Sequence, residues 1–220
     1  MFGFNYYHPI REAVLGIKST FDRFPNLRGL SGTHTVLSTL GLRFDTRPAR
    51  ENSTYGVLID LAAGGVLSQV SKSKHYGIIR AETKFLWDET SRIYGAARAL
   101  WSYVYGAGIP FYERQSYGGS FIGRGFILDR FVDSGLWTID FEQRITTAVL
   151  HVEGSTLHVR VDPFVTVGQV YRKAADFFDR IQITEGIGFR AFSPPNVMAR
   201  IDIARDESEF NVYVELGYPF

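Results

Sequence analysis

The sequence lacks cysteine altogether and has only 2 methionines in 220 residues. Without cysteine there is no disulfide bond, no thiolate nucleophile and no thiolate metal site. Lys+Arg number 24 and Asp+Glu 23, so no excess of positive charge favours binding to nucleic acid. No run reaches the roughly 18 apolar residues of a transmembrane helix. Segment 1–18 lacks the basic start and the continuous apolar stretch of a signal peptide, so for an exported protein we expect the natural start to be missing.

Aromatic residues and glycine are abundant instead. The chain has 18 Phe, 12 Tyr and 3 Trp, which make it 15% aromatic, together with 22 Gly. A chain rich in both, with balanced charges and a hydropathy close to neutral, has the composition of a membrane β-barrel, whose strands alternate apolar and polar residues.

An alternation with a period of two runs along most of the chain. In segment 75–87, Ile79 and Phe85 fall on one face and Arg80 and Glu82 on the other. Successive side chains of a strand point to opposite faces, so the pattern predicts strands with one apolar and one charged face. It predicts about ten strands, with boundaries good to roughly 2–4 residues. Their ranges are 11–22, 34–45, 54–66, 75–87, 95–106, 135–146, 157–170, 185–193, 196–204 and 210–220.

The connections between these strands differ in length. Segments 88–92 and 193–196 are short, whereas 107–134 and 171–184 are long. Tight turns at one rim and long loops at the other are typical of outer-membrane barrels. Within the last loop, the apolar residues of 171–181 fall near helical spacing and are compatible with a short, locally packed helix.

Alternation alone does not say which face lies inside. In a soluble β-sandwich or a lipocalin-like barrel the apolar face would point inward. Charges of both signs within the strands favour the inverted arrangement, because they suit a hydrated lumen with cross-strand ion pairs. Aromatic residues near strand ends resemble the interfacial girdles of membrane barrels. We therefore predict an all-β fold, a transmembrane antiparallel β-barrel. The girdle residues are Tyr55, Trp87, Trp101, Tyr103, Tyr105, Trp137, Tyr218 and Phe220.

Several motifs resemble, in order, the C-terminal barrel portion of the BamA/TamA superfamily, the Omp eighty-five proteins or bacterial surface antigens. GLRFDTRPARENSTYGVLIDL is similar to that family's strand, periplasmic turn and strand. IPFYERQSYGGSFIGRGF resembles the approach to its long loop, which ends in Val/Leu-Arg-Gly-Phe/Tyr, with Gly123 as a departure at the first of these positions. WTIDFEQRI, TEGIGFRAFSPPNVMARIDIA and VELGYPF resemble the strand after that loop, the strand pair near the end and the C-terminal insertion signal.

The resemblance implies a fold, a place and a role. Residues 1–220 would be the last ten or so strands of a barrel of about sixteen strands, without the family's POTRA domains. The barrel would lie in the outer membrane of a Gram-negative bacterium, or of a related organelle. Its role would be insertion, assembly or translocation of proteins, without cofactor or ATP. Its partners would be the lipid bilayer, unfolded outer-membrane protein clients and periplasmic or lipoprotein partners, with no nucleic acid.

The resemblance also implies a role for the arginine of FIGRGF. In the family, the long loop folds into the lumen and its arginine pairs with acidic residues on the inner wall. Carried over, Arg124, Gly125 and Phe126 form a loop-lock motif, and Glu142 is the expected partner. A guanidinium binds a carboxylate through two hydrogen bonds, and partial burial strengthens that interaction. A solvated loop charge is the alternative interpretation.

The polar faces supply further candidates for ion pairs in the lumen. The family's second acidic position falls on Thr166 here, and Asp162 lies on the same face at another height, so we expect a weaker or rearranged lock. The lumen-facing residues predicted to form ion pairs are Arg144, Asp162, Arg190 and Arg200.

The last predicted strand, 210–220, is the candidate for the barrel seam. In the family, the first and last strands pair weakly, and a client strand adds to the exposed edge. Gly217 and Pro219 weaken pairing, because proline donates no hydrogen bond and glycine packs little. Tyr218 and Phe220, with Gly217, form the expected C-terminal insertion signal.

No active site emerges from the residues. The histidines have neither metal-ligand spacing nor a nucleophile motif beside them. Asp140 and Glu142 share a face, but Arg124 or Arg144 accounts for Glu142 better than acid–base chemistry does. We therefore predict that the chain is not an enzyme and holds no metal or cofactor.

Two other functions remain open. The chain could be a passive small barrel, such as a pore, an adhesin or a structural protein, whose narrow lumen its own side chains and loop would fill. It could also anchor an enzyme encoded upstream, such as a patatin-like lipase. The sequence upstream of Met1 would discriminate among these functions.

Overall fold

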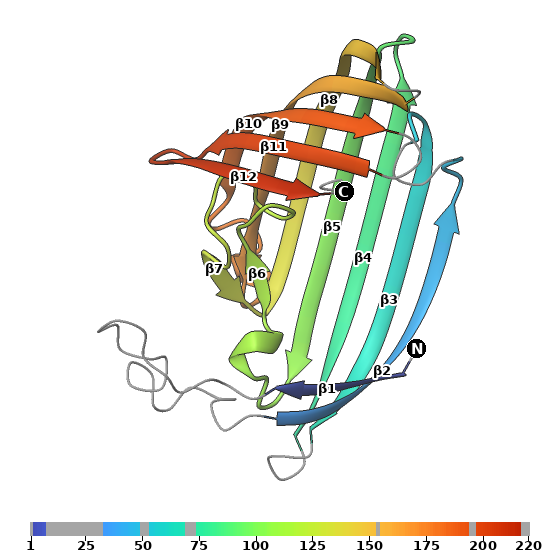
Figure 1. The fold of residues 1–220 in the computed structure, drawn as a ribbon. Coiled ribbons are helices and arrows are strands. Elements are labelled where there is room, and N and C mark those ends of the chain that lie inside the picture. The colour runs from blue at the N-terminus through green and yellow to red at the C-terminus, as the bar shows by residue number, and fades with distance from the viewer. Residues whose placement is uncertain are drawn as a thin grey trace.

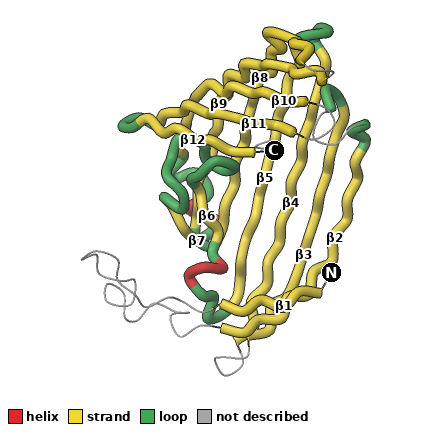
Figure 2. The backbone as a smooth tube through the Cα atoms, viewed as in Figure 1, coloured by secondary structure: helices red, strands yellow, loops and turns green. Residues whose placement is uncertain are grey.

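The computed structural model describes residues 2–7, 33–48, 53–68, 74–152, 155–193 and 197–216. They form a ten-stranded antiparallel sheet in the order β1-β2-β3-β4-β5-β8-β9-β10-β11-β12, with β6 and β7 as a separate pair (Figure 1). Strands dominate the backbone, as Figure 2 shows. The prediction of an all-β antiparallel fold is confirmed. The strands are β1 (Phe2–Tyr7), β2 (Thr33–Asp45), β3 (Gly56–Ser68), β4 (Lys74–Asp88), β5 (Ile93–Gly106), β6 (Gln115–Tyr117), β7 (Phe131–Asp133), β8 (Gly135–Val152), β9 (Ser155–Tyr171), β10 (Gln182–Ser193), β11 (Val197–Arg205) and β12 (Phe210–Leu216).

Most predicted strands coincide with observed ones. The predicted strand 11–22 lies outside the described residues, as does the end of 210–220. The short strands β1, β6 and β7 were not predicted, because three to six residues are too few for a clear alternation. The helix considered for 171–181 is wrong: only a three-residue 3-10 turn, Ala174–Asp176, forms there. The reason is that the Gln169 side chain binds the backbone at both Asp176 and Arg180, which holds this connection against β9.

The sheet is apolar outside and polar inside. Along β8, Asp140 is fully buried and Glu142 is 3% exposed, whereas the alternate residues Ile139 and Phe141 are 39% and 50% exposed. This arrangement is that of a transmembrane barrel and the reverse of a soluble one. The face prediction is therefore confirmed. No helix in the described ranges is long and apolar enough to span a membrane.

On the outer face, aromatic rings of one strand pack over glycines of the neighbouring strand. A Cβ at Gly95 would overlap the ring of Trp87, and a Cβ at Gly135 would overlap that of Tyr171. Glycine alone packs poorly in a strand, and a ring laid over it restores the lost contact. This pairing accounts for part of the unusual content of both residue types.

The sheet curls strongly. In Figure 1, β10, β11 and β12 run across the direction of β3, β4 and β5, and the connection between β5 and β8 lies on the concave side. Among the described residues, β1 pairs only with β2 and β12 only with β11, so the sheet has two open edges. We call the end where β5 and β9 finish and β8 and β10 begin the loop rim.

Candidate functional site: a loop held on the inner wall

The connection 107–134 folds onto the inner face of the sheet. Its hairpin, β6 and β7, brings Tyr117 into a buried apolar cluster with Phe126 and the inward-facing Leu100 and Leu136 of the wall. Tyr117 is fully buried and Phe126 is 5% exposed. Burial of two aromatic side chains supplies the largest apolar contribution to holding the loop in place.

Two glycines let the loop approach the wall. Gly123, with φ 66°, and Gly125, with φ 115°, both occupy conformations that disfavour other residues. A Cβ at Gly125 would lie 2.9 Å from the Thr184 side chain of β10. Glycine at position 123, where the resembled family has valine or leucine, therefore suits the backbone that this loop adopts.

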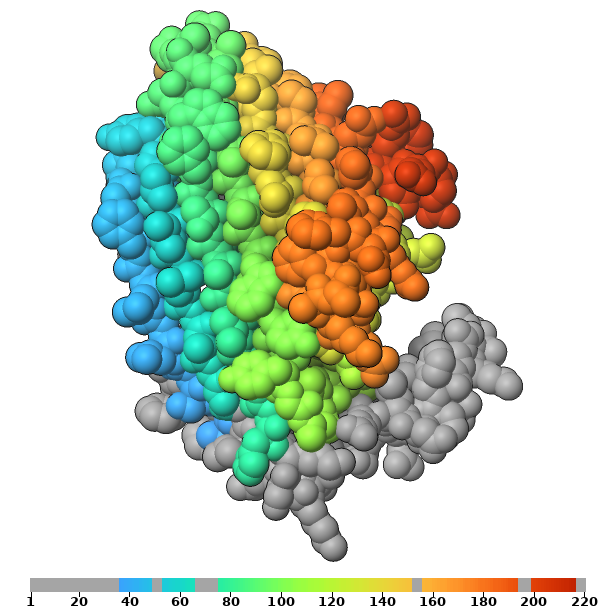
Figure 3. All heavy atoms as spheres, turned by 180° about the vertical axis from the view of Figure 1, so that it is seen from behind, coloured from blue at the N-terminus to red at the C-terminus, as the bar shows by residue number. Residues whose placement is uncertain are grey.

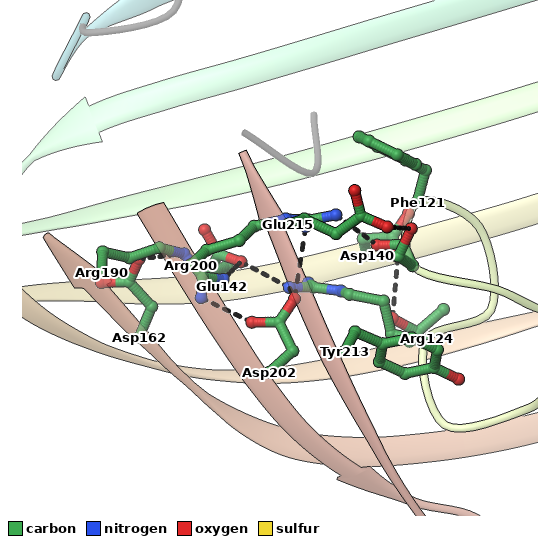
Figure 4. Close-up of polar contacts among 12 residues, drawn as sticks. Phe121, Arg124, Asp140, Glu142, Asp162, Arg190, Arg200, Asp202, Tyr213 and Glu215 are labelled. Carbon is green, nitrogen blue, oxygen red and sulfur yellow. Dashed lines mark hydrogen bonds and ion pairs between the residues drawn. The ribbon is translucent and has the colours of Figure 1, made fainter. Parts of the chain in front are cut away.

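Arg124 lies between these glycines and points into the wall (Figure 4). Its side chain has no exposed surface, and its Nη1 lies 2.9 Å from Glu142 Oε2 and 3.6 Å from Asp202 Oδ2. The guanidinium carbon also lies 3.5 Å from the centroid of the Phe164 ring. The carboxylate at the edge of the guanidinium balances its charge, and the ring on its face adds a cation–π contact.

Glu142 and Asp202 belong to a larger network across four strands. Glu142 Oε1 accepts a 2.7 Å hydrogen bond from Arg144, and Glu142 Oε2 lies 3.6 Å from Arg190. Asp202 lies 2.5 Å from Arg190 and 3.2 Å from Arg200. Because all these side chains are buried, removal of one carboxylate would leave several guanidiniums uncompensated.

Asp162 extends the network to β9. Its Oδ2 lies 2.8 Å from Arg160 and 3.4 Å from Arg190. Arg190 therefore bridges three carboxylates from β8, β9 and β11. Arg190 thereby connects β8, β9 and β11, the three strands whose side chains contact Arg124.

Two wall arginines also hold the backbone of the loop. Arg98, which pairs with Asp140 at 2.9 Å, donates a 2.6 Å hydrogen bond to the Phe121 carbonyl. Arg200 donates a 3.0 Å hydrogen bond to the Ser120 carbonyl. The segment before Arg124 is thus fixed by strands on either side of the inner face.

A third set of contacts joins the loop to β12. The Tyr213 hydroxyl donates to the Phe126 carbonyl at 2.5 Å and accepts from the Gly125 N–H at 3.3 Å. Asn211 donates to the Gly125 carbonyl at 2.6 Å. Ser120 donates to Glu215 at 2.8 Å. The edge strand of the sheet is therefore tied to the loop as well as to β11.

The structure brings most of the candidate residues together. Arg124 and Glu142 are in contact, and Gly125 and Phe126 make the bonds to β12. Arg144, Asp162, Arg190 and Arg200 all lie in the network around them. Gly217, Tyr218 and Phe220 lie outside the described residues.

Sequence reasoning missed the second carboxylate near Arg124. Thr166, at the family's second acidic position, donates a 2.7 Å hydrogen bond to Asp140 instead. Asp202, from β11, occupies the place beside Arg124. Its position on the polar face was visible in the sequence, but the strand order and curl that bring β11 over the loop were not. The contacts of Asn211 and Tyr213 were missed for the same reason.

The carboxylates of this region are held by arginines. No group of three or more metal-ligating side chains occurs in the described ranges. The arrangement joins the loop to β5, β8 and β11 through buried arginines and carboxylates, to β9 through the Phe164 ring, and to β12 through hydrogen bonds. These contacts hold the loop against the inner face of the sheet.

Comparison with known proteins bears on the fold. No protein-family model matches the sequence, and no curated protein matches it. Among solved structures, the chain is similar to BamA from Haemophilus ducreyi lacking POTRA domains 1–3, with a TM-score of 0.65 and 16% sequence identity. The similarity covers 84% of this chain and 41% of that chain, so this chain spans less than half its length. At this identity the likeness shows the fold, a BamA-like β-barrel.

Proposed function

We propose that this chain is part of an outer-membrane β-barrel of the BamA/TamA type, which inserts, assembles or translocates proteins at that membrane. The order of the sequence motifs, the inverted polarity of the sheet and the BamA-like fold support this proposal. The lipid bilayer would contact the apolar outer face. Unfolded outer-membrane proteins would be the clients, and periplasmic or lipoprotein partners would deliver them.

The observation that carries the proposal is the attachment of the loop to β12. In the described part of the chain, the other side of β12 has no strand partner. An open edge presents backbone N–H and C=O groups to which a client strand can add. The loop, locked by Arg124 and bonded to Tyr213, holds this edge in one position. Gly125 and Phe126 of the lock motif thus contact the edge strand, as does Ser120.

The proposal is tested by reconstitution. The full chain is refolded into lipid vesicles, and the folding of an added unfolded eight-stranded barrel protein is followed by its resistance to protease. We expect faster folding than in empty vesicles, and a smaller acceleration with the Tyr213→Phe variant. Arg92→Gln, in the distant turn between β4 and β5, is the matched control. Equal folding rates in vesicles with and without the protein would contradict an assembly role.

A passive structural barrel is the second candidate. The loop and the buried arginine network fill the inner side of the sheet, which favours a structural role over a pore. In the reconstitution assay a passive barrel would insert into vesicles without accelerating client folding. An anchor for an upstream enzyme stays a prediction, to be tested on the sequence that precedes Met1.

A further inference from the structure

A second polar site lies at the loop rim, away from the Arg124 network. A cavity of about 550 Å³ is lined by β7 residues from the inner side and by the connection 172–181 from the outer side. Three of its lining residues are Arg130, Arg172 and Arg180. Its volume is in the range of small-ligand sites, roughly 300–1,000 Å³.

The guanidiniums of this cavity lack a directly paired carboxylate, although that of Arg130 lies 6.0 Å from the centroid of the Phe131 ring and interacts electrostatically with Asp206. In the described part of the chain no carboxylate forms an ion pair with Arg130, Arg172 or Arg180. This contrasts with the inner network, where arginines and carboxylates are closely paired. Exposed guanidiniums that share one cavity repel one another and favour an anion between them.

Most of the acidic groups beside the cavity are engaged elsewhere. Asp133 lies 3.6 Å from Arg114 and accepts a 2.7 Å hydrogen bond from the Ser134 N–H. Asp176 accepts a 3.2 Å hydrogen bond from the Lys173 N–H. Asp179 also lines the cavity, and Asp206 interacts with Arg130 from outside it. Because Asp133 is paired with Arg114 and none of the three arginines has a carboxylate within ion-pair distance in the described part of the chain, the arginines are available to an anionic ligand.

Aromatic and apolar residues beside the cavity resemble those found at a membrane interface. The ring of Phe177 stacks on Trp137 at 5.8 Å, and Trp137 Nε1 donates to the Phe177 carbonyl at 2.9 Å. Phe178 and Ile181 point away from the protein, 70% and 44% exposed. In Figure 3 the orange segment that includes these residues stands out from the outer surface.

The neighbouring strand ends complete an aromatic belt at this level. Trp101 Nε1 donates to the Tyr171 hydroxyl at 2.6 Å, and the Tyr103 hydroxyl donates to the Arg172 carbonyl at 3.1 Å. Rings with one apolar end and one polar end gather where lipid headgroups meet acyl chains. The arginines of the cavity thus lie at the depth of headgroups.

We propose that this cavity binds the phosphate group of a membrane lipid headgroup. Arg130, Arg172 and Arg180 donate to the phosphate oxygens, which the planar guanidinium fits well. Phe178 and Ile181 contact the acyl chains of the same lipid. These exposed apolar residues favour a lipid over free phosphate as the ligand. The proposal rests on the membrane location within the proposed function.

The test uses native mass spectrometry of the full chain, refolded in a non-ionic detergent and mixed with phosphatidic acid. We expect the wild type and Arg92→Gln to retain one lipid, and a variant with Arg130, Arg172 and Arg180 all changed to Gln to retain it about tenfold less. Diacylglycerol with the same acyl chains, which lacks the phosphate, should not be retained. If the triple variant fails to fold, the three single Arg→Gln variants provide the same comparison, each with about a twofold loss.

Equal retention by wild type and triple variant would overturn the proposal. Displacement of the lipid by millimolar inorganic phosphate would also overturn it, in favour of free phosphate as the ligand. The readout is independent of the assembly role: retained phosphatidic acid without faster client folding would contradict the assembly role alone. Faster client folding without phosphate-dependent retention would contradict this site alone.

Discussion

Glu142 and Phe164 are direct partners across β8 and β9, and together they form the receptor for Arg124. The carboxylate lies 2.9 Å from the Arg124 guanidinium, and the ring lies 3.5 Å from it on another side. The register of one hairpin thus builds the site. Because side chains alternate along a strand, a shift of either strand by one residue would turn its member of this pair outward.

Breaking the pair should release the loop. Arg124→Ala removes the buried guanidinium, and Glu142→Ala leaves it without its closest carboxylate. We expect each change to cost about 3–5 kcal/mol of stability. We also expect faster protease cleavage within 107–134 for the folded barrel in detergent. Arg43→Ala, which breaks an exposed ion pair with Asp60, is the control and should cost at most about 1 kcal/mol. Unchanged cleavage in both Arg124→Ala and Glu142→Ala would rule out the lock.

The ring under Arg124 should contribute separately from the charge. Phe164→Leu keeps an apolar side chain but removes the aromatic face. Buried cation–π contacts contribute about 2 kcal/mol, so the midpoint of urea unfolding should fall. Phe141→Leu, on the outer face of β8, removes a ring with no arginine on it and should change the midpoint less. Equal effects would mean that the ring acts only through its volume.

Asp202 should be as important as Glu142, although it lies on a different strand. It lies within 3.6 Å of Arg124 and closer to Arg190 and Arg200. Asp202→Asn keeps the shape but removes the charge, so three buried guanidiniums lose a shared partner, at a cost of about 3–5 kcal/mol. Asp60→Asn, in an exposed pair, is the matched change. A similar, small effect of both substitutions in urea unfolding would show that the network is not cooperative.

The bonds between the loop and β12 should protect that strand. Tyr213→Phe removes the hydroxyl that contacts both Gly125 and Phe126. Each hydrogen bond contributes roughly 0.5–1.5 kcal/mol, so amide hydrogen exchange in β12 should speed up about tenfold. Exchange in β3 and β4 should not change. Tyr105→Phe on the outer face is the control. Unaltered exchange in β12 would show that pairing with β11 alone holds the strand.

Glycines under aromatic rings should tolerate no side chain. Gly95→Ala would force Trp87 off its position, with a loss of about 1–3 kcal/mol, since overpacking displaces neighbours. Gly65→Ala is the matched control, because a Cβ there meets nothing within 4 Å, and its effect should stay within about 0.5 kcal/mol. Urea unfolding of both variants makes the comparison. A neutral Gly95→Ala would mean that the ring has other positions of equal energy.

The sequence predicted most strands of the fold but few contacts of the site. Strands β2 to β5 and β8 to β12 and the polarity of their faces were predictable, because both follow from the alternation of neighbouring residues. The three-residue strands β6 and β7 were not predicted, because they lie in the segment expected to be a long connection. The pairing of Arg124 with Glu142 was expected only through a family resemblance. The contacts of Asp202, Asn211 and Tyr213 with the loop were not predicted, since each joins two residues that are more than seventy positions apart in the chain.

What the sequence determined by itself is local: where strands run, which of their faces is apolar, and that a glycine-flanked arginine lies in a long connection. These follow from steric alternation along the backbone. What only the tertiary structure decided is which carboxylates meet Arg124 and which strand the loop holds. Those contacts depend on strand order, register and the curl of the whole sheet, which carries β11 and β12 across to the loop. No short stretch of sequence encodes that curvature, because it accumulates from the twist between successive strands.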